Sequence, residues 1–530
     1  MRNLELPGRS PVHATEGMAC TSHPLSSQVA IDTLKAGGNA LDAAVAACAV
    51  QCVVEPESTG IGGDCFCLYS PEGAAAPIAF NGSGAAPAAA TAEWYGDQGI
   101  TDIERHSPHA VTIPGAIDGW HQLVRDHGTL SLGTLLQPAI AYAWNGYPIS
   151  SRVHMDFKGQ IDLLAKDENA SRVFMPGGKV PDVGQLHRQP ELAATLEAIA
   201  EGGRDAFYTG AVAEDIVSYL QSKGGLHTLE DFTAVKGDYV SPISVDFRGH
   251  QIFQCPPNGQ GVIALLLLNI MSGIEPGTDL LSVDRIHTEI EAIRLAYAIR
   301  DLYVADPAQV DVPVDRLLSG DNASALRKEI DPAKAGSALP DIRPPAHAAT
   351  VYISVVDKDR NACSFINTLF GSFGSGLFAP RSGVMLQNRG QGFTLEIGHP
   401  NCIAPGKRPL HTIIPGMISR DNRAVMPFGV MGGQYQAAGH MQFLTRYFDF
   451  GLDLQEAMDQ PRFFADPTTG DVQVETGIPD DVRDGLRAKG HHLVAPPKPI
   501  GGSQAIWIDW EQNVLTGGSD PRKDGCAIGY

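Results

Sequence analysis

The sequence has little positive charge for its length, and it has no long apolar run. Of its 530 residues, 39 are Lys or Arg and 60 are Asp or Glu, which gives a formal net charge of −21 at pH 7. Non-specific binding to nucleic acid or to an anionic membrane needs a basic surface, so this balance argues against both. The longest apolar run, IALLLLNI over residues 263–270, is far shorter than the ~20 residues of a membrane-spanning helix. We therefore expect no nucleic-acid partner and no membrane insertion.

The chain also lacks the cysteine pattern of a disulfide framework or of a structural metal site. Its nine cysteines are scattered, and an odd number does not suit a set of paired disulfides. Cys65 and Cys67 form a C-x-C pair with no second Cys/His pair nearby, so buried free thiols in a reducing compartment are favoured over a metal site. The amino-terminal residues contain no apolar segment followed by a small-residue cleavage site. These observations predict a cytoplasmic protein with neither metal nor cofactor.

Two other patterns resemble ligand sites but lack a required part. The Gly60-Ile61-Gly62-Gly63 run precedes a predicted strand instead of following one, and it lacks the G-x-G-x-x-G spacing of dinucleotide-binding loops. His287 and Glu291 lie four residues apart on a helix predicted over residues 284–302, and they could in principle share a metal ion. With no third ligand in view, an ordinary surface pair is the favoured interpretation.

The order of predicted elements indicates a large layered protein. A chain of 530 residues exceeds the roughly 250–300 at which one hydrophobic core stops growing, so it forms two domains or one large layered one. Helices are predicted over residues 26–36, with a serine cap and a stop at Gly37-Gly38, and over residues 40–53. Residues 331–349 have the Pro/Ala-rich composition of a linker, and two β-rich runs follow, over 350–357 and 362–370. The turn-like KDRN between these runs predicts a hairpin.

The predicted hairpin begins abruptly with Thr350, directly after the linker. A threonine hydroxyl is a weak nucleophile unless a base lies within hydrogen-bond reach. The α-amino group of an N-terminal threonine supplies such a base, because its pKa in model peptides is about 7.7–8.0. A cut in the chain just before Thr350 would create this arrangement. Threonine is common in strands, however, so this pattern alone also fits an ordinary strand residue.

Several sequence blocks together resemble the γ-glutamyltransferase (γ-glutamyltranspeptidase) family of N-terminal-nucleophile (Ntn) hydrolases. They comprise residues 22–47, 53–66, 255–261 (CPPNGQG), 291–307, 350–361 (TVYISVVDKDRN), 373–376 (FGSG), 405–415, 460–464 and 519–530 (SDPRKDGCAIGY). The resemblance implies an α/β fold, namely a four-layer αββα sandwich of the Ntn-hydrolase type. It also implies autocatalytic cleavage between Ala349 and Thr350 into a large (α) subunit, residues 1–349, and a small (β) subunit, residues 350–530, intertwined in one domain.

The resemblance further implies roles for residues around Thr350, which would attack an amide to form an acyl-enzyme. Thr368 matches the family threonine that hydrogen-bonds the nucleophile, with an ordinary strand threonine as the alternative. Gly432 and Gly433 match the glycine pair whose backbone N–H groups form the oxyanion hole, with turn glycines as the alternative.

The residues with which the family binds a glutamyl group are largely replaced in this chain. Where the family has an arginine, this chain has Asn81 and Gly82. A family asparagine corresponds to Phe370, a glutamine and an aspartate correspond to Arg389 and Gly392, and a serine pair corresponds to His411-Thr412. Losing an acid and gaining a guanidinium favours a carboxylate over an ammonium group, if Arg389 points into the pocket. A surface Arg389 and a packed loop His411 are the alternatives.

We therefore expect a self-processing threonine amidohydrolase that cleaves an amide of a small anionic acid, as oxamate amidohydrolases do. The alternatives are a γ-glutamyltransferase or glutathione hydrolase with a rebuilt pocket, an acylase of a bulkier amide of the cephalosporin type, and a binding protein without turnover. The expected partners are a small-molecule amide and the two subunits of the same proenzyme. Pairing of processed heterodimers into a homodimer, and the choice between water and an amine as acyl acceptor, stay open.

Overall fold

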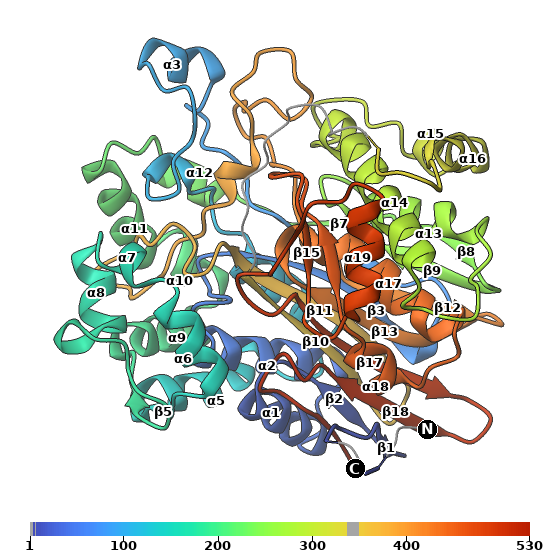
Figure 1. Cartoon of the computed structure of the whole chain (residues 1–530). Helices are drawn as coiled ribbons and strands as arrows, with labels where there is room; N and C mark the ends of the chain where they lie inside the picture. The colour runs from blue at the N-terminus through green and yellow to red at the C-terminus, as the bar shows by residue number, and fades with distance from the viewer. Residues whose placement is uncertain (1–3, 6, 337–348) are drawn as a thin grey trace.

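The computed structural model describes residues 4–5, 7–336 and 349–530, so most of the predicted linker lies outside the described residues. Two seven-stranded antiparallel sheets pack face to face, and helices cover the outer face of each sheet (Figure 1). The predicted four-layer αββα sandwich is confirmed. No helix among the described residues combines the length and the apolar character needed to cross a membrane.

Both sheets combine strands from before and after the predicted cleavage point. The first sheet has the order β19 (Ala527–Gly529), β2 (Met18–Cys20), β10 (Ala349–Val356), β11 (Ala362–Phe370), β3 (Asp64–Ser70), β4 (Ile78–Gly82) and β7 (Asp238–Val240). The second has the order β1 (Val12–Ala14), β18 (Val514–Ser519), β17 (Gly502–Asp509), β13 (Arg423–Met431), β12 (Gly416–Arg420), β9 (His250–Gln254) and β8 (Ile243–Phe247). Cleavage between Ala349 and Thr350 stays a prediction. If it occurs, each sheet will contain strands from both of the resulting chains.

The helical layers have separate hydrophobic cores. The first sheet is covered by α1 (Pro24–Lys35), α2 (Ala40–Val54), α4 (Ala116–His127), α5 (Leu132–Asn145) and α9 (Pro190–Gly202). The second is covered by α13 (Gly261–Ser272), α14 (Val283–Tyr303), α17 (Gln436–Phe448) and α18 (Leu454–Asp459). A third core, which includes Phe66, Tyr352, Ile366 and Met417, fills the space between the sheets.

Shorter elements surround these layers. The helices are α3 (Ala92–Asp97), α6 (Ser151–Lys158), α7 (Ile161–Leu164), α8 (Glu168–Phe174), α10 (Arg204–Tyr208), α11 (Ala211–Ser222), α12 (Leu229–Ala234), α15 (Val314–Leu317), α16 (Gly320–Glu329) and α19 (Asp480–Ala488). The strands are β5 (Tyr147–Pro148), β6 (Leu186–His187), β14 (Phe463–Ala465), β15 (Val472–Val474) and β16 (Leu493–Val494).

The long predicted helices exist, but the predicted serine cap is wrong. The first helix begins at Pro24, and its N-cap is His23, whose Nδ1 accepts the N–H of Leu25 at 3.2 Å. Proline is well suited to the first helical turn because its φ is already helical and its missing N–H is not needed there. Gly37 ends the segment with φ of +98°, as the Gly37-Gly38 stop predicts.

The predicted surface pair on α14 is also wrong. His287 and Glu291 are only 1% and 5% exposed, and His491 lies beside them in the fold. The spacing of four residues does place both side chains on one helix face, but that face packs against another part of the chain. The third residue is distant in sequence, so spacing could not reveal it.

The predicted hairpin is confirmed as β10 and β11, which form the centre of the first sheet. Ile353 and Val355 pack against the helical layer, while Tyr352 and Val356 face the second sheet. Both faces of β10 are therefore buried, which explains why its sequence is a nearly continuous apolar run. Thr350 lies at a register irregularity at one end of the hairpin, where its Oγ1 contacts Thr368 of β11 and Gln436 of α17.

The glycine run before β3 is explained by close backbone packing. A Cβ built on Gly62 would lie 2.2 Å from the carbonyl oxygen of Met385, and one on Gly63 would lie 2.0 Å from that of Thr368. Only glycine fits such approaches. All nine cysteines are free, and Cys65 and Cys67 are buried in the core, as the sequence predicts.

The contact at Gly63 predicts a measurable loss of stability. Replacing Gly63 with alanine forces a methyl group against the backbone of β11, so Gly63→Ala should lower the free energy of unfolding by about 3 kcal/mol. Gly96→Ala is the matched control, because nothing lies within 4 Å of its Cβ position in α3 and alanine favours a helix by about 1 kcal/mol. Urea unfolding of both variants checks this, and equal stability of the two would contradict the packing argument.

Candidate active site

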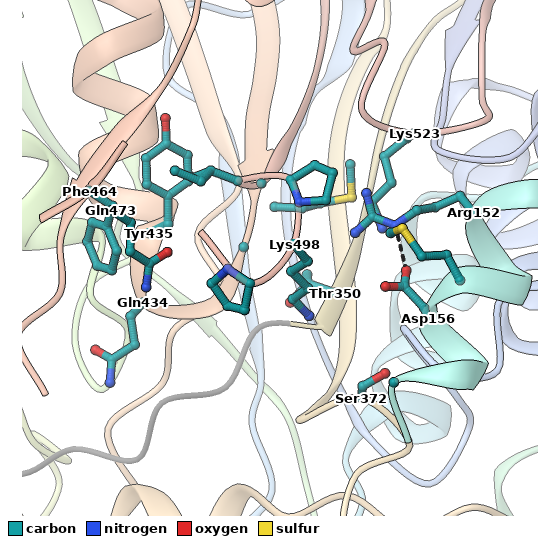
Figure 2. A pocket seen from close by; sticks show the side chains of 18 of the residues that line it. Arg152, Asp156, Thr350, Ser372, Gln434, Tyr435, Phe464, Gln473, Lys498 and Lys523 are labelled. Carbon is teal, nitrogen blue, oxygen red and sulfur yellow. Dashed lines mark hydrogen bonds and ion pairs between the residues drawn. The ribbon is translucent and has the colours of Figure 1, made fainter. Parts of the chain in front are cut away.

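A cavity of about 510 Å³ opens at the start of β10, and Thr350 is part of its wall (Figure 2). This volume lies within the range of about 300–1,000 Å³ typical of small-molecule sites. The wall is built from segments distant in sequence. Its polar and apolar residues include Arg105, Arg152, Asp156, Ser372, Gly432, Gln434, Tyr435, Phe464, Asp466, Lys498 and Lys523.

The hydroxyl of Thr350 lies within a group of aligned polar side chains. Its Oγ1 is 3.3 Å from Oγ1 of Thr368, which in turn accepts the backbone N–H of Phe370 at 2.8 Å. Nε2 of Gln436 donates to Thr350 Oγ1 at 3.4 Å, while its Oε1 accepts the N–H of Ile414 and so fixes the amide orientation. Either hydroxyl of the Thr350–Thr368 pair can be the donor, so Thr368 can donate to the oxygen of Thr350. Both neighbours can therefore stabilise negative charge on that oxygen.

The neighbouring backbone is held in uncommon conformations. Gly432 lies in the cavity wall with φ of +132°, and Gly433 follows with φ of +58°. The Gly433 carbonyl accepts a hydrogen bond from Gln260 Nε2 at 3.1 Å, so the turn is anchored from behind. Phe370 has φ of +75°, which is rare for a bulky residue. Such strain is often found at functional sites.

The cavity wall carries more cations than anions. Arg105, Arg152, Lys498 and Lys523 oppose the two carboxylates Asp156 and Asp466. Arg152 and Asp156 form a 2.7 Å ion pair along α6, which neutralises one of each sign. Burial lowers the pKa of Lys498 to about 8 and that of Arg105 to about 10, because a charged group loses hydration there. The remaining positive charge suits an anionic group in the cavity.

Three of the predicted substrate-binding residues form a buried cluster next to the cavity and do not line it. The guanidinium of Arg389 is fully buried, stacks over the ring of Phe370 at 3.9 Å and donates to Thr412 Oγ1 at 3.1 Å. Burial lowers the pKa of Arg389 to about 9. Phe370 connects this cluster to Thr368 through its backbone N–H. Arg389 thus lies close to the candidate nucleophile, and its direct contact with substrate stays a prediction.

His411 and Asn81 support loops near the site. Nε2 of His411 lies 3.0 Å from Asp64 Oδ2, and its Nδ1 accepts the N–H of Ile413. Burial and the nearby Arg389 lower the pKa of His411 to about 4, so the ring is neutral and donates to Asp64. Asn81 donates to Asn258 Oδ1 at 2.9 Å. Neither side chain lines the cavity, and their predicted roles in substrate binding stay untested.

The cations of the cavity wall were not predicted as site residues from the sequence. Arg105 ends a stretch without basic residues, Lys498 follows two prolines, and Lys523 belongs to the C-terminal SDPRKDG block. Each is unremarkable in isolation, because a lone basic residue normally lies at the surface. Only the fold brings them to one wall.

Comparisons with known proteins place the chain in a family. The family model described as Gamma-glutamyltranspeptidase matches residues 26–530. The glutathione hydrolase-like YwrD proenzyme of Bacillus subtilis is 38% identical, with 98% of this chain and 99% of the relative covered. The oxamate amidohydrolase proenzyme of Klebsiella pneumoniae is 33% identical, and the match covers 98% of this chain and 99% of that relative.

A solved structure has the same fold. The cephalosporin acylase from Bacillus halodurans superposes with a TM-score of 0.92 at 38% identity, covering 100% of this chain and 99% of that chain. The match covers the whole of this chain, which includes the hairpin of β10 and β11. The chain belongs to the γ-glutamyltranspeptidase family, and it is an enzyme of the Ntn-hydrolase fold.

Proposed function

We propose that this chain is a self-processing threonine-nucleophile amidohydrolase whose substrate carries a carboxylate on its acyl group. One observation carries the proposal: Thr350, in hydrogen-bond contact with Thr368 and Gln436, lies in the wall of a cavity lined by four cationic side chains. The proenzyme names of the relatives support the processing step.

Processing begins when Thr350 Oγ1 attacks the carbonyl carbon of Ala349. The C–N bond between the two residues breaks and an ester to Thr350 forms, while the released nitrogen takes up the proton lost by Oγ1 and becomes the α-amino group of Thr350. Water then opens the ester, leaving a carboxylate on Ala349 and a free hydroxyl on Thr350. The hydrogen bonds from Gln436 and Thr368 stabilise the negative charge that develops on Oγ1. The products are chains of residues 1–349 and 350–530.

Turnover uses the new α-amino group as the base. The α-amino group of an N-terminal residue has an ordinary pKa of about 7.7–8.0, which is close to neutral pH and suits a general base. The amine takes the Oγ1 proton, Oγ1 attacks the substrate carbonyl, and an acyl-enzyme forms as the amine product leaves. Backbone N–H groups at Gly432-Gly433 are the proposed oxyanion hole. Water then releases the acid.

The charge of the cavity favours a carboxylate and disfavours a γ-glutamyl group. A γ-glutamyl substrate carries an α-ammonium group, which the cations of the wall repel. Oxamate carries only a carboxylate beside its amide, and the oxamate amidohydrolase relative supports this substrate class.

A bulkier amide of an anionic acid is the second candidate. Oxamate would fill only a small part of the 510 Å³ cavity, whose wall also includes the apolar surfaces of Tyr435, Phe464 and Met155. The structural likeness to a cephalosporin acylase supports a substrate of this size. Both candidates share the carboxylate and the reaction at Thr350.

Replacing the proposed nucleophile should abolish processing. Thr350→Ala removes the attacking oxygen, so denaturing electrophoresis should show one full-length band at every time point. The wild type should give two bands, and N-terminal sequencing should find the smaller one beginning at Thr350.

Two variants make this test specific. Thr350→Ser keeps a hydroxyl and should still be cleaved, more slowly, whereas Thr33→Ala removes a distant threonine of α1 and should be cleaved normally. Cleavage of Thr350→Ala at the same bond would contradict the proposal.

Two anilides that differ by one group test the substrate class. Glutaryl anilide lacks only the α-ammonium group of γ-glutamyl anilide, so the wild type should hydrolyse the glutaryl compound faster. Lys498→Met removes a cation from the wall and should raise KM for glutaryl anilide by about 10–100-fold, since a hydrogen bond to a charged group is worth about 1.5–3 kcal/mol.

Arg389→Met is the matched comparison, because it removes a buried cation that does not line the cavity. Its KM should change less than that of Lys498→Met. A larger effect at Arg389 would identify that residue as the one that binds the carboxylate. Faster hydrolysis of γ-glutamyl anilide would overturn the proposed substrate class while leaving the nucleophile in place.

A further inference from the structure

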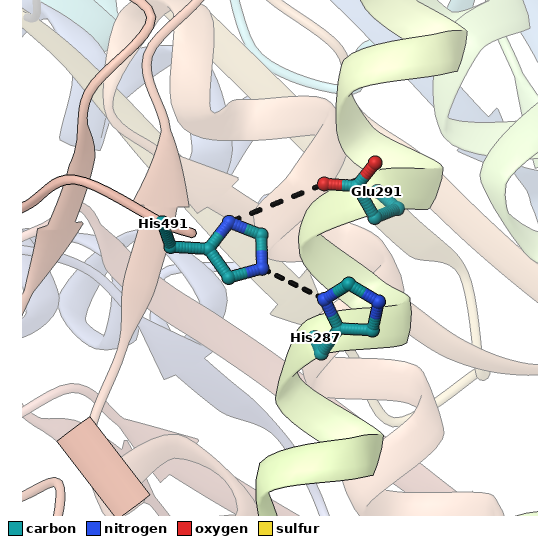
Figure 3. A group of neighbouring side chains, drawn as sticks. All are labelled: His287, Glu291 and His491. Atoms are coloured by element: carbon teal, nitrogen blue, oxygen red, sulfur yellow. Dashed lines mark hydrogen bonds and ion pairs between the residues drawn. The ribbon is translucent and has the colours of Figure 1, made fainter. Parts of the chain in front are cut away.

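A second cluster of ionisable side chains lies apart from the Thr350 cavity (Figure 3). His287 and Glu291 project from one face of α14, and His491 reaches them from the turn between α19 and β16. One ligand atom from each lies within 4.8 Å of the others. The three residues are 1%, 5% and 3% exposed, and none lines the cavity at Thr350.

The hydrogen bonds of His287 fix its tautomer. Its Nε2 lies 2.9 Å from the carbonyl oxygen of Asp331, which can only accept, so Nε2 carries the proton. In a neutral ring the lone pair is then on Nδ1, which faces the cluster. An outer hydrogen bond that orients a histidine in this way is typical of metal-binding histidines.

The contacts of His491 leave one polar atom unsatisfied. Its Nε2 is 2.7 Å from Nδ1 of His287, while its buried Nδ1 has no hydrogen-bond partner and lies 4.0 Å from Glu291 Oε1. If Nε2 carries the proton, the lone pair of Nδ1 faces the carboxylate. If Nδ1 carries it, two lone pairs meet at 2.7 Å. Either neutral tautomer therefore has an unfavourable contact, which a cation among the three residues would remove.

We propose that His287, Glu291 and His491 bind one divalent transition-metal ion of the zinc class. Two imidazole nitrogens and a carboxylate oxygen form a ligand set that such ions prefer. Zinc holds nitrogen ligands at about 2.0–2.1 Å, so tetrahedral partners stand roughly 3.3 Å apart and the 2.7 Å histidine contact widens when the ion binds.

The two neighbouring cations, Arg294 and Lys489, are compatible with metal binding by these three residues. Arg294 Nη1 lies 3.1 Å from Glu291 Oε1, but a carboxylate offers about four lone-pair sites and can serve both groups. Lys489, the other nearby cation, is paired with Asp284 at 3.0 Å and bonded to the carbonyl of Pro332.

The position of the site indicates a structural role for the ion. Both outer partners come from residues 331–336: the Asp331 carbonyl accepts from His287, and the Gly336 N–H donates to Glu291 Oε2 at 2.9 Å. Ala335 N–H also bonds to the carbonyl of Lys489 at 2.7 Å. A bound ion would therefore fasten to α14 the segment that precedes the proposed cleavage point.

Metal titration of the full-length protein tests the proposal. After chelator treatment and dialysis, calorimetry with Zn²⁺ should show one site per chain, and the ion should raise the melting temperature. His491→Ala and the near-isosteric Glu291→Gln should each weaken binding by at least about tenfold, since even outer partners of metal ligands are worth about 10–100-fold. His492→Ala is the matched control, because that neighbouring side chain is 78% exposed and outside the cluster.

A spectroscopic measurement on the wild type needs no variant that could misfold. Co²⁺ should give the visible absorption bands of a four-coordinate site, and Zn²⁺ should displace them. Absence of these bands, or equal Zn²⁺ affinity in the wild type, His491→Ala and Glu291→Gln proteins, would overturn the proposal.

Discussion

The pairing of β10 with β11 is the interaction on which the rest of the structure depends. The two strands are antiparallel over nearly their whole length, and they are buried between the helical layer and the second sheet. This pairing brings Thr350 opposite the end of β11, where Thr368 and Phe370 lie. The glycine run beside Thr368 lets the chain approach β11 closely on its other edge. A rigid hairpin thus gives the hydroxyl of Thr350 one orientation relative to the polar groups around it.

The distribution of charge separates the cavity from the rest of the molecule. The chain as a whole has a formal net charge of −21, yet the wall around Thr350 carries four cations against two carboxylates. A cationic recess in an acidic protein concentrates its field within the cavity, where low-dielectric walls strengthen it. Under the proposed function, this charge favours a substrate that carries a carboxylate.

Patterns among residues close together in the sequence predicted individual helices and strands. The hairpin, the alanine-rich α2 and the long α14 follow from apolar spacing, turn residues and capping, and resemblance to a family supplied the four-layer arrangement. Local reasoning failed where distant segments meet. His491 lies 204 residues from His287, and the cations of the cavity come from four separate segments. Arg389 stacks on Phe370 and does not line the cavity, an arrangement that depends on packing and not on sequence spacing, and its contact with substrate stays a prediction.

The central claim is that Thr350, as the first residue of a cleaved chain, carries the acyl group during turnover. Mass spectrometry of protein quenched during hydrolysis of glutaryl anilide tests this most directly. The account predicts a glutaryl adduct on the peptide that begins with Thr350, with the acyl group on the side-chain oxygen. An adduct on any other residue, or steady turnover by a chain still intact at Ala349-Thr350, would contradict it.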